Sequence, residues 1–515
     1  MAVDVVWFKR DLRIHDHGPL RDAVASGDPV ICLYVIEPEL WALPEYSGRQ
    51  YAFLLECLDS LDAALKAKGG SLTVRVGKVT AVLDALHAEH AISTVRAHEE
   101  TGLRWSWERD KTVARWARVN GAAFLETPQH GVIRGLSTRN GWAKRWEAFM
   151  SQPVIAAPER IETAIAASDP IPGANALGLA PDPCPDRQPG GRRAAVSDLN
   201  SFLSERGEDY RRAMSSPLTA YDACSRLSAH LAFGTVSMRE AFQAADRALK
   251  ARRSSGETGY AKSIDSFVSR LHWHCHFIQK FEDEPGIETT DLHPAYRGVR
   301  PEPDEETVRR WIEGETGFPF VDACMRALNA TGWLNFRMRA MVAAFSSYHL
   351  WVDWKRPAEA LARRFIDFEP GIHYAQFQMQ SGTTGVNTPR IYNPVKQGHD
   401  QDPDGVFTRR WVPELSGLPA SLIHEPWKAP VDVLAAAGVT LGGTYPERMV
   451  DHEQAAREAR ARIGALRKGE DHREAAKAIQ IKHGSRKSGL KQTGSASSRK
   501  KARKAEDDRQ ARFEF

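Results

Sequence analysis

The sequence predicts an α/β N-terminal domain built on a parallel sheet, followed by an all-α C-terminal domain. At 515 residues the chain is too long for a single hydrophobic core. Between residues 3 and 126, short β-branched apolar runs alternate with amphipathic stretches, whereas residues 196–466 show helical periodicity nearly throughout. These two patterns indicate two domains of different architecture.

Five apolar runs predict the strands of the first domain. They read VDVVWF from Val3, PVICLYVI from Pro29, SLTVRV from Ser71, AISTVRAH from Ala91 and AAFLE from Ala122. Amphipathic segments separate them, for instance the stretch from Ala52 to Lys68. Buried strands with helices between them predict βαβ units, and hence a parallel sheet.

The composition divides the chain into four regions. Residues 1–130 are expected to form the α/β domain, and residues 131–195 an interdomain linker that is crowded with Pro, Gly and Asp from Ser168 onward. Residues 196–466 are expected to form the helical domain. Residues 467–515 are rich in Lys, Arg, Ser and Gly, which predicts a basic tail that is disordered or loosely helical.

The overall composition is that of a globular protein. Hydrophobic residues make up 42% and charged residues 26% of the chain, and no run approaches the roughly 18 apolar residues of a membrane span. The N-terminus lacks the order of a secretory signal, so we expect a cytoplasmic protein without membrane contact. Six scattered cysteines form no C-x-x-C pair, which argues against a disulfide framework. The net charge of +4 does not by itself indicate nucleic-acid binding.

Charged residues follow the first predicted strand, in the run KRDLR from Lys9 to Arg13. The carboxyl ends of parallel strands form the edge at which open α/β sheets bind ligands. No Gly-rich dinucleotide or phosphate-binding motif accompanies this run. An ion-paired loop is therefore an equally good interpretation of these residues.

The helical half carries two histidines, His272 and His276, one helical turn apart. This spacing is permissible for zinc, but no further ligand cluster accompanies it, so we expect no metal site. Lining of a cofactor cleft and packing in the core remain as interpretations. Tryptophans also concentrate in this half, and they serve as core residues, as electron carriers or as stacking surfaces for a base.

Several segments together resemble the photolyase/cryptochrome family in order and spacing. WFKRDLRIHDHGPL, from Trp7, is similar to the family's opening strand and loop, and SRLSAHLAFGTVSMRE, from Ser225, to its flavin-phosphate segment. The stretch from Trp311 to Arg339 resembles the most distinctive segment of the family. The segment from Arg390 to Leu415 continues the similarity, which spans Val3 to about Trp427.

This resemblance implies a Rossmann-like N-terminal domain of the antenna type and an all-α C-terminal domain that binds FAD. It leaves open whether a second, antenna chromophore of the folate or deazaflavin type is bound. Light absorbed by reduced FAD is expected to drive one electron into a pyrimidine dimer of DNA and to split it. Enzymes of this kind flip their target out of the base stack.

The resemblance also implies which residues contact FAD. Tyr210, Ser225, Leu227 and Ser228 match residues that hold the ribose and the diphosphate. The residues expected near the isoalloxazine or lining the same site are Arg270, His274, Trp333, Arg339, Asp367, Glu369 and His373. Within this set, Arg339 and Asp367 match an ion pair beside the flavin.

One position beside the flavin departs from the family pattern. His373 stands where an asparagine usually faces flavin N5. Because histidine titrates near neutral pH, a protonation state of the flavin that depends on pH is one expectation. A neutral histidine with a structural role is the other.

The chain of tryptophans that carries electrons to the flavin also differs from the family pattern. Phe377 takes the place of the first tryptophan, while Trp354 and Trp311 match the second and the third. Phenylalanine is a poor relay, so we expect slow photoreduction or another path. The residues available for such a path are Tyr374, Tyr348 and Trp351.

The lesion pocket is the most divergent part of the resemblance. Arg270, Phe336 and Met379 replace a glutamate, an asparagine and a tryptophan, which leaves Trp273 of the usual aromatic clamp. The histidine pair of the class that repairs (6-4) photoproducts is not restored. Only three cysteines lie in the catalytic half, so we expect no iron-sulfur cluster.

Two functions follow from these residues. The first is repair of cyclobutane pyrimidine dimers, with Trp273, His373, Trp354 and Trp311 as catalytic residues. The DNA contacts would come from Trp273, Phe336 and Met379 and, on the phosphates, from Arg211, Arg212 and the basic tail. The second is a cryptochrome-type blue-light photoreceptor that acts through a signalling partner, which the replaced lesion contacts favour. A dark flavin redox reaction is disfavoured because no nicotinamide-binding fingerprint is present.

Overall fold

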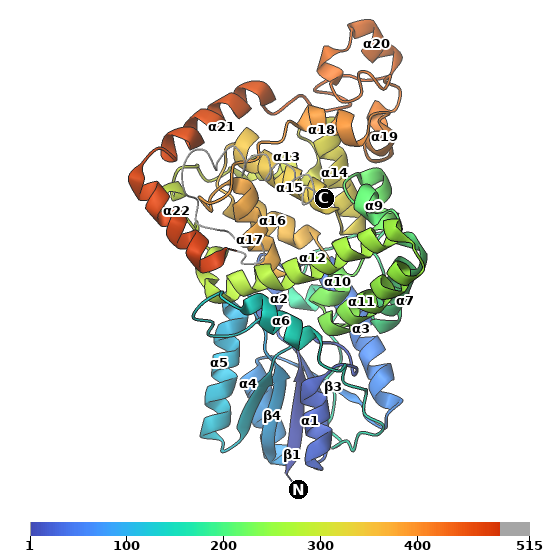
Figure 1. Ribbon diagram of the computed structural model, residues 1–515, viewed down its shortest axis with the longest axis vertical. Helices are drawn as coiled ribbons and strands as arrows, with labels where there is room; N and C mark the ends of the chain where they lie inside the picture. Colours follow the sequence, from blue (N-terminus) through green and yellow to red (C-terminus); the bar gives the residue numbers. More distant parts are fainter. Residues whose placement is uncertain (1, 485–515) are drawn as a thin grey trace.

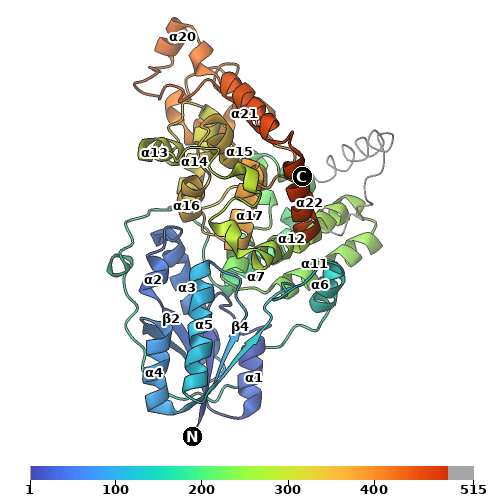
Figure 2. The same cartoon turned by 90° about the vertical axis from the view of Figure 1, so that its left-hand side faces the viewer.

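The computed structural model describes residues 2–484, which form an α/β part and a helical part (Figures 1 and 2). The N-terminus lies at the far end of the sheet, and the strands run from there toward the helical part. The carboxyl ends of the strands therefore face the helices. The predicted combination of an α/β domain with an all-α domain is confirmed.

Five strands form one sheet in the order β3-β2-β1-β4-β5, and all neighbouring pairs are parallel. The strands are β1 (Val3–Phe8), β2 (Val30–Ile36), β3 (Leu72–Val76), β4 (Ile92–His98) and β5 (Ala123–Thr127). In the register of the central pair, Val6 lies beside Cys32. Each predicted apolar run forms one strand, because β-branched residues suit a sheet that is covered on both faces.

Helices cover both faces of the sheet. They are α1 (Gly18–Ser26), α2 (Pro38–Trp41), α3 (Gly48–Lys66), α4 (Val79–His90) and α5 (Arg104–Val119). Successive strand residues point to opposite faces. Val6 and Phe8 thus share a core cluster with residues of α1 and α3, whereas Val5 and Trp7 share one with residues of α4 and α5.

The region 131–195, expected to be a linker, follows the α/β part and contains the helix α6 (Trp142–Met150). Backbone hydrogen bonds join Val30 to Glu162 and to Ala164, which fixes this region beside the sheet. Trp142 and Trp146 are buried in a core cluster of the helical part. The helix α6 therefore packs with the second domain although it precedes the segment rich in Pro and Gly.

Besides the π-helical turn η2 (Phe202–Arg206), the helical part contains sixteen further α-helices within the described residues and a second π-helical turn. They are α7 (Arg192–Ser201), α8 (Tyr210–Ala213), α9 (Pro217–Ala223), α10 (Ser228–Ala232), α11 (Met238–Ser254), α12 (Thr258–Asp283), α13 (Glu305–Glu313), α14 (Pro319–Thr331), α15 (Phe336–Ala344), η5 (Phe345–His349), α16 (Lys355–Arg364), α17 (Pro370–Ser381), α18 (Pro394–Gln401), α19 (Val406–Trp411), α20 (Val431–Ala436), α21 (His452–Leu466) and α22 (Glu470–His483). The amphipathic run from Thr307 to Asn329 forms two helices, α13 and α14. Gly314 ends the first with φ 72°, and Pro319 begins the second.

The region predicted as a basic tail begins with an ordered helix. Helix α22 is held on the helical part by His472, whose Nε2 lies 3.1 Å from the Tyr296 hydroxyl and whose ring stacks on His293. The rest of the tail, from residue 485, lies outside the described residues. In the part of the chain that the structure describes, no helix is long and apolar enough to cross a membrane.

Candidate functional site

The loop between α9 and α10 carries three of the residues predicted to hold the FAD diphosphate. Ser225 and Leu227 lie at its end, and Ser228 is the first residue of α10. The Ser225 hydroxyl accepts a hydrogen bond from the Leu227 N–H at 3.5 Å. Arg226, between them, adopts the left-handed conformation with φ 60°, which is rare for a residue with a side chain.

The guanidinium of Arg226 is buried without an anion. It is held over the rings of Tyr221 and Trp333, 4.2 Å and 4.0 Å from their centroids, and the residue is only 6% exposed. Both terminal nitrogens lack a hydrogen-bond partner among the described residues. Burial, the largest cause, lowers the pKa of this group. A buried unpaired cation is costly, so these contacts fit a bound diphosphate.

Arg226 was missed by the sequence analysis, which named its neighbours on both sides. An arginine inside a Ser-x-Leu-Ser segment was the available signal. Its burial between Tyr221 and Trp333 becomes visible only when the loop after α9 meets the end of α14.

Tyr210 and Arg270 lie close together on α8 and α12. Burial raises the pKa of the Tyr210 hydroxyl, and the nearby Arg270 guanidinium opposes this shift. The same guanidinium lies 5.6 Å from the ring centroid of Phe336, at the start of α15. Arg270 thus links a residue predicted for FAD with one predicted for the lesion.

Arg339 and Asp367 form the ion pair that the resemblance implies. Arg339 Nη2 lies 2.7 Å from Asp367 Oδ2, and its Nε donates to the Leu334 carbonyl at 2.7 Å. Its guanidinium is held 4.0 Å from the ring centroid of Phe365. The second carboxylate oxygen, Asp367 Oδ1, is buried and has no hydrogen-bond partner within the described part of the chain. This oxygen fits an N–H donor of a ligand such as the flavin ring edge.

Glu369 is paired with an arginine from the other domain. Arg10, directly after β1, lies 2.9 Å from Glu369 Oε2 and donates to the carbonyls of Ala232 and Phe368 at 2.9 and 3.0 Å. Burial raises the pKa of Glu369, and Arg10 opposes this. The charged run after the first strand therefore is an ion-paired loop, and its partner is a predicted flavin residue.

His373 is fixed in a neutral form. Its Nε2–H donates to the Ala358 carbonyl at 2.8 Å, which leaves Nδ1 as an acceptor. Burial lowers the pKa of His373 to about 4. Burial likewise lowers the pKa of His274 to about 3, and the Nδ1 of His274 has no partner among the described residues. The structure thus favours the neutral, structural alternative for His373.

The aromatic residues of the predicted electron chain are buried together. Trp354 and Trp311 are each 1% exposed, and the Trp354 indole N–H donates to Asp291 at 2.9 Å. The ring of Phe377 lies 6.5 Å from that of Trp354. Tyr374 lies closer, 6.2 Å from Trp354 and 5.4 Å from His373.

Phe377 interrupts the predicted path between the flavin site at His373 and Trp354. Of the three alternative carriers, Tyr374 is the one whose ring lies beside both His373 and Trp354. Its hydroxyl donates to Glu45 Oε1 at 2.5 Å. Tyr348 and Trp351, by contrast, lie against the guanidinium of Arg300. The geometry therefore favours Tyr374 for this role.

The residues predicted to contact DNA are only partly buried. Phe336 is 49% exposed, whereas Trp273 and Met379 are half-buried. The Trp273 ring stacks on Phe277 with their centroids 5.6 Å apart. Arg211 is half-buried on α8, and the neighbouring Arg212 is exposed. The exposed ring of Phe336, with the Arg270 guanidinium beside it, suits an unstacked nucleic-acid strand.

A histidine cluster that the sequence analysis missed lies at the carboxyl end of β1. Asp11 Oδ2 lies 2.9 Å from His17 Nε2 and 2.7 Å from His98 Nδ1. Among the residues that the structure describes, these three place their ligand atoms close enough together to hold a metal ion. However, His17 Nδ1 accepts from the Leu20 N–H, so its Nε2 carries the proton and has no lone pair for a metal. The cluster instead ties the β1 loop to α1 and β4.

Known proteins match this chain along both of its parts. The family profile described as DNA photolyase matches residues 4–147, and that described as the FAD binding domain of DNA photolyase matches residues 267–465. A Streptomyces griseus protein named deoxyribodipyrimidine photo-lyase is 33% identical over 495 residues, which cover 91% of this chain and 99% of the relative. A Natronomonas pharaonis protein named cryptochrome DASH is 29% identical over 477 residues, covering 88% and 98%.

A solved structure agrees with these sequence matches. The crystal structure of a bacterial class III photolyase from Agrobacterium tumefaciens superposes with a TM-score of 0.80 at 28% identity, covering 91% of this chain and 98% of that one. The buried groups of Arg226 and Asp367 fit the diphosphate and the isoalloxazine edge of FAD. With two family profiles in the right order and a relative aligned along nearly its whole length, this chain belongs to the photolyase/cryptochrome family.

Proposed function

We propose that this protein is a deoxyribodipyrimidine photolyase, an enzyme that binds FAD and splits cyclobutane pyrimidine dimers in DNA by light. The observation that carries the proposal is the pair of unsatisfied buried groups, the Arg226 guanidinium and Asp367 Oδ1. A cationic cradle and a carboxylate acceptor match the diphosphate and the ring edge of FAD. The Streptomyces griseus relative, at 33% identity, bears the photo-lyase name.

The residues of the site divide the work of binding and catalysis. FAD, when bound here and reduced, would supply the electron that splits the dimer on excitation by light. Arg226 binds the diphosphate, and Asp367, oriented by Arg339, accepts from the ring edge. His373 presents its neutral Nδ1, and Tyr374 connects this region to Trp354. Binding of FAD is thus shared by the loop after α9 and the helices α15 and α17.

On the DNA side, each predicted contact residue has its own role. Trp273 and Phe336 supply faces for the flipped bases, and Met379 supplies apolar surface. Arg211 and Arg212 bind backbone phosphates. These contacts remain predictions, as do a second, antenna chromophore and the cytoplasmic location.

A cryptochrome-type photoreceptor is the second candidate. It is favoured by the guanidinium of Arg270 lying against Phe336, where the family pattern has a glutamate and an asparagine that contact the dimer. The relative named cryptochrome DASH has a lower identity of 29%. In this alternative, light changes the flavin and a protein partner reads the change.

The deciding experiment measures repair directly. The purified protein with chemically reduced FAD is illuminated with a dimer-containing oligonucleotide, and recovery of thymine absorbance is followed. We expect recovery in light and none in a dark control. A paired variant, Arg212→Ala, should raise the amount of protein needed for repair, whereas Arg247→Ala, on α11, should not. No recovery by protein that holds FAD would favour the photoreceptor.

A further inference from the structure

A cavity of about 220 Å³ lies between η5, the segment before α18 and the first turns of α21. Its walls include His349, Tyr392, His452, Arg457 and Arg460. None of these residues belongs to the predicted FAD or lesion contacts. The cavity is therefore separate from the site described above.

The floor of the cavity is a histidine with no hydrogen bond. His349 is 3% exposed, and both of its ring nitrogens lack a partner among the residues that the structure describes. The ring packs on Phe345, with the centroids 5.1 Å apart at an angle of 18°. Its neighbour His452 is 6% exposed and has an unpartnered Nδ1. Buried imidazole nitrogens are normally satisfied, so these positions point to a missing ligand.

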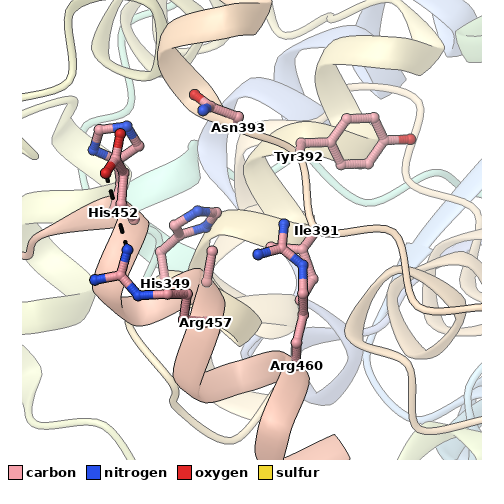
Figure 3. A pocket seen from close by; sticks show the side chains of 9 residues that line it. His349, Ile391, Tyr392, Asn393, His452, Arg457 and Arg460 are labelled. Carbon is pink, nitrogen blue, oxygen red and sulfur yellow. Dashed lines mark ion pairs between the residues drawn. The ribbon is translucent and has the colours of Figure 1, made fainter. Parts of the chain in front are cut away.

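The rim of the cavity is cationic. Arg457 and Arg460 rise from the same helix, and Figure 3 shows the ring of His349 between their guanidinium groups. Arg460 has no ion pair or hydrogen bond within residues 2–484. Arg457 has one distant partner, Glu453, whose carboxylate oxygen is 4.0 Å away. Two guanidinium groups against one carboxylate leave a net positive charge over the two histidines.

The neutral ring of His349 leaves one N–H donor for a ligand that accepts hydrogen bonds. Burial lowers its pKa to about 3, and the neighbouring His452 and Arg460 act in the same direction. The neutral ring offers one N–H donor and one acceptor. A phosphate P–O⁻ oxygen accepts hydrogen bonds, so it matches this N–H and the planar guanidinium donors.

We propose that this cavity binds a phosphate group through the guanidinium groups of Arg457 and Arg460 and the imidazole of His349. The phosphate belongs either to a nucleic-acid backbone or to free phosphate and small phosphorylated molecules. Both sources present P–O⁻ oxygens, which accept from the same guanidinium and imidazole N–H donors.

Calorimetric titration of the full-length, FAD-loaded protein with inorganic phosphate, in the dark and at low salt, tests the proposal. FAD fills its own phosphate contacts during this measurement. We expect a Kd of about 1 mM or tighter. Arg460→Gln should weaken binding by about tenfold, as expected for loss of one charge-assisted hydrogen bond. Arg462→Gln is the matched control on the same helix, since Arg462 pairs with Glu458, and it should leave the Kd unchanged.

His349→Phe gives a second, independent readout. The phenyl ring keeps the stacking on Phe345 but removes both nitrogens, so phosphate binding should fall by tenfold or more. Absence of phosphate binding by the native protein would overturn the proposal. Equal affinity in the native protein and in Arg460→Gln would overturn it as well, because the phosphate would then be bound elsewhere.

A competition experiment separates the two sources. The titration is repeated with saturating undamaged oligonucleotide. Loss of phosphate binding, with weaker oligonucleotide binding by Arg460→Gln, supports the cavity as a contact for the DNA backbone. An unchanged phosphate Kd in the presence of DNA supports a site for free phosphate or a small phosphorylated molecule. Neither arm requires light, so failure of repair leaves this test unaffected.

Discussion

At the scale of single residues, the structure identifies groups that are buried but not satisfied. Arg226 has a guanidinium between two aromatic rings and no anion, and Asp367 has one free carboxylate oxygen within the described residues. Such groups are rare in folded proteins because an unpaired buried polar atom loses its hydrogen bonds to water and gains none within the protein. They therefore mark positions where a bound ligand would supply the missing hydrogen-bond partners.

Arg226 provides the sharpest test of the flavin site. Arg226→Leu should weaken FAD binding by about 10-fold to 100-fold, the effect of losing hydrogen bonds to a charged group. The Kd is measured from flavin fluorescence on titration of the apoprotein. Arg212→Leu, on the exposed side of α8, serves as the control and should keep the native Kd. An unaltered affinity in Arg226→Leu would place the diphosphate elsewhere.

Because His373 stays neutral, the flavin site should not change its protonation state near neutral pH. Its pKa of about 4 keeps the ring neutral throughout the range from pH 6 to pH 9. The visible spectrum of bound FAD should therefore stay constant over this range, in the native protein and in His373→Asn. A spectral step near pH 6.5 in the native protein alone would show that His373 titrates.

At the scale of elements, the loop after β1 joins the two domains at the flavin site. Arg10→Gln should lower the free energy of unfolding by about 1–3 kcal/mol, less than for a fully buried pair because the Arg10 side chain is 20% exposed. The double variant with Glu369→Gln should recover part of this loss, since no carboxylate is then left unpaired. Denaturant unfolding of the four proteins measures this coupling. Additive losses would mean that the pair contributes nothing.

Helix α17 carries the candidate electron carrier that replaces the missing tryptophan. Tyr374→Phe should slow the light-dependent reduction of bound FAD about tenfold or more, because the ring beside Trp354 and His373 is kept but the hydroxyl that makes it oxidisable is lost. Transient absorption measures the rate. Tyr348→Phe is the matched control and should retain the native rate. Equal rates in both variants would exclude Tyr374 from the path.

At the scale of the whole molecule, buried neutral histidines make the fold sensitive to acid. The pKa is lowered to between about 3 and about 4, mainly by burial, for His98, His130, His274, His349 and His373. Their pKa in the unfolded chain is about 6.5. Stability is thus fully present above pH 6.5 and falls as the pH decreases toward 4, because only the unfolded state binds these protons. Glu288, with a pKa raised to about 7, acts in the opposite direction.

This linkage gives a measurable difference between two pH values. The free energy of unfolding should be lower at pH 5.0 than at pH 7.5, with an upper contribution of about 2 kcal/mol from each of these histidines. Urea unfolding at both pH values tests this. His349→Phe should reduce the difference, whereas replacement of the exposed His399 by glutamine should not. Equal stability at the two pH values would contradict the neutral state of these histidines.

The sequence by itself determined the fold class and, through the family resemblance, predicted the residues of the site. Five β-branched runs predicted the five strands, because the alternation of buried strands and amphipathic helices is a local property of the chain. The segments around Ser225 and Arg339 indicated FAD. The tertiary structure decided what depends on distant neighbours: the contact of Arg10 with Phe368, 358 positions away, and the buried, unsatisfied state of Arg226 and His349. Burial and charge pairing arise from atoms that are far apart in the sequence, so no local pattern encodes them.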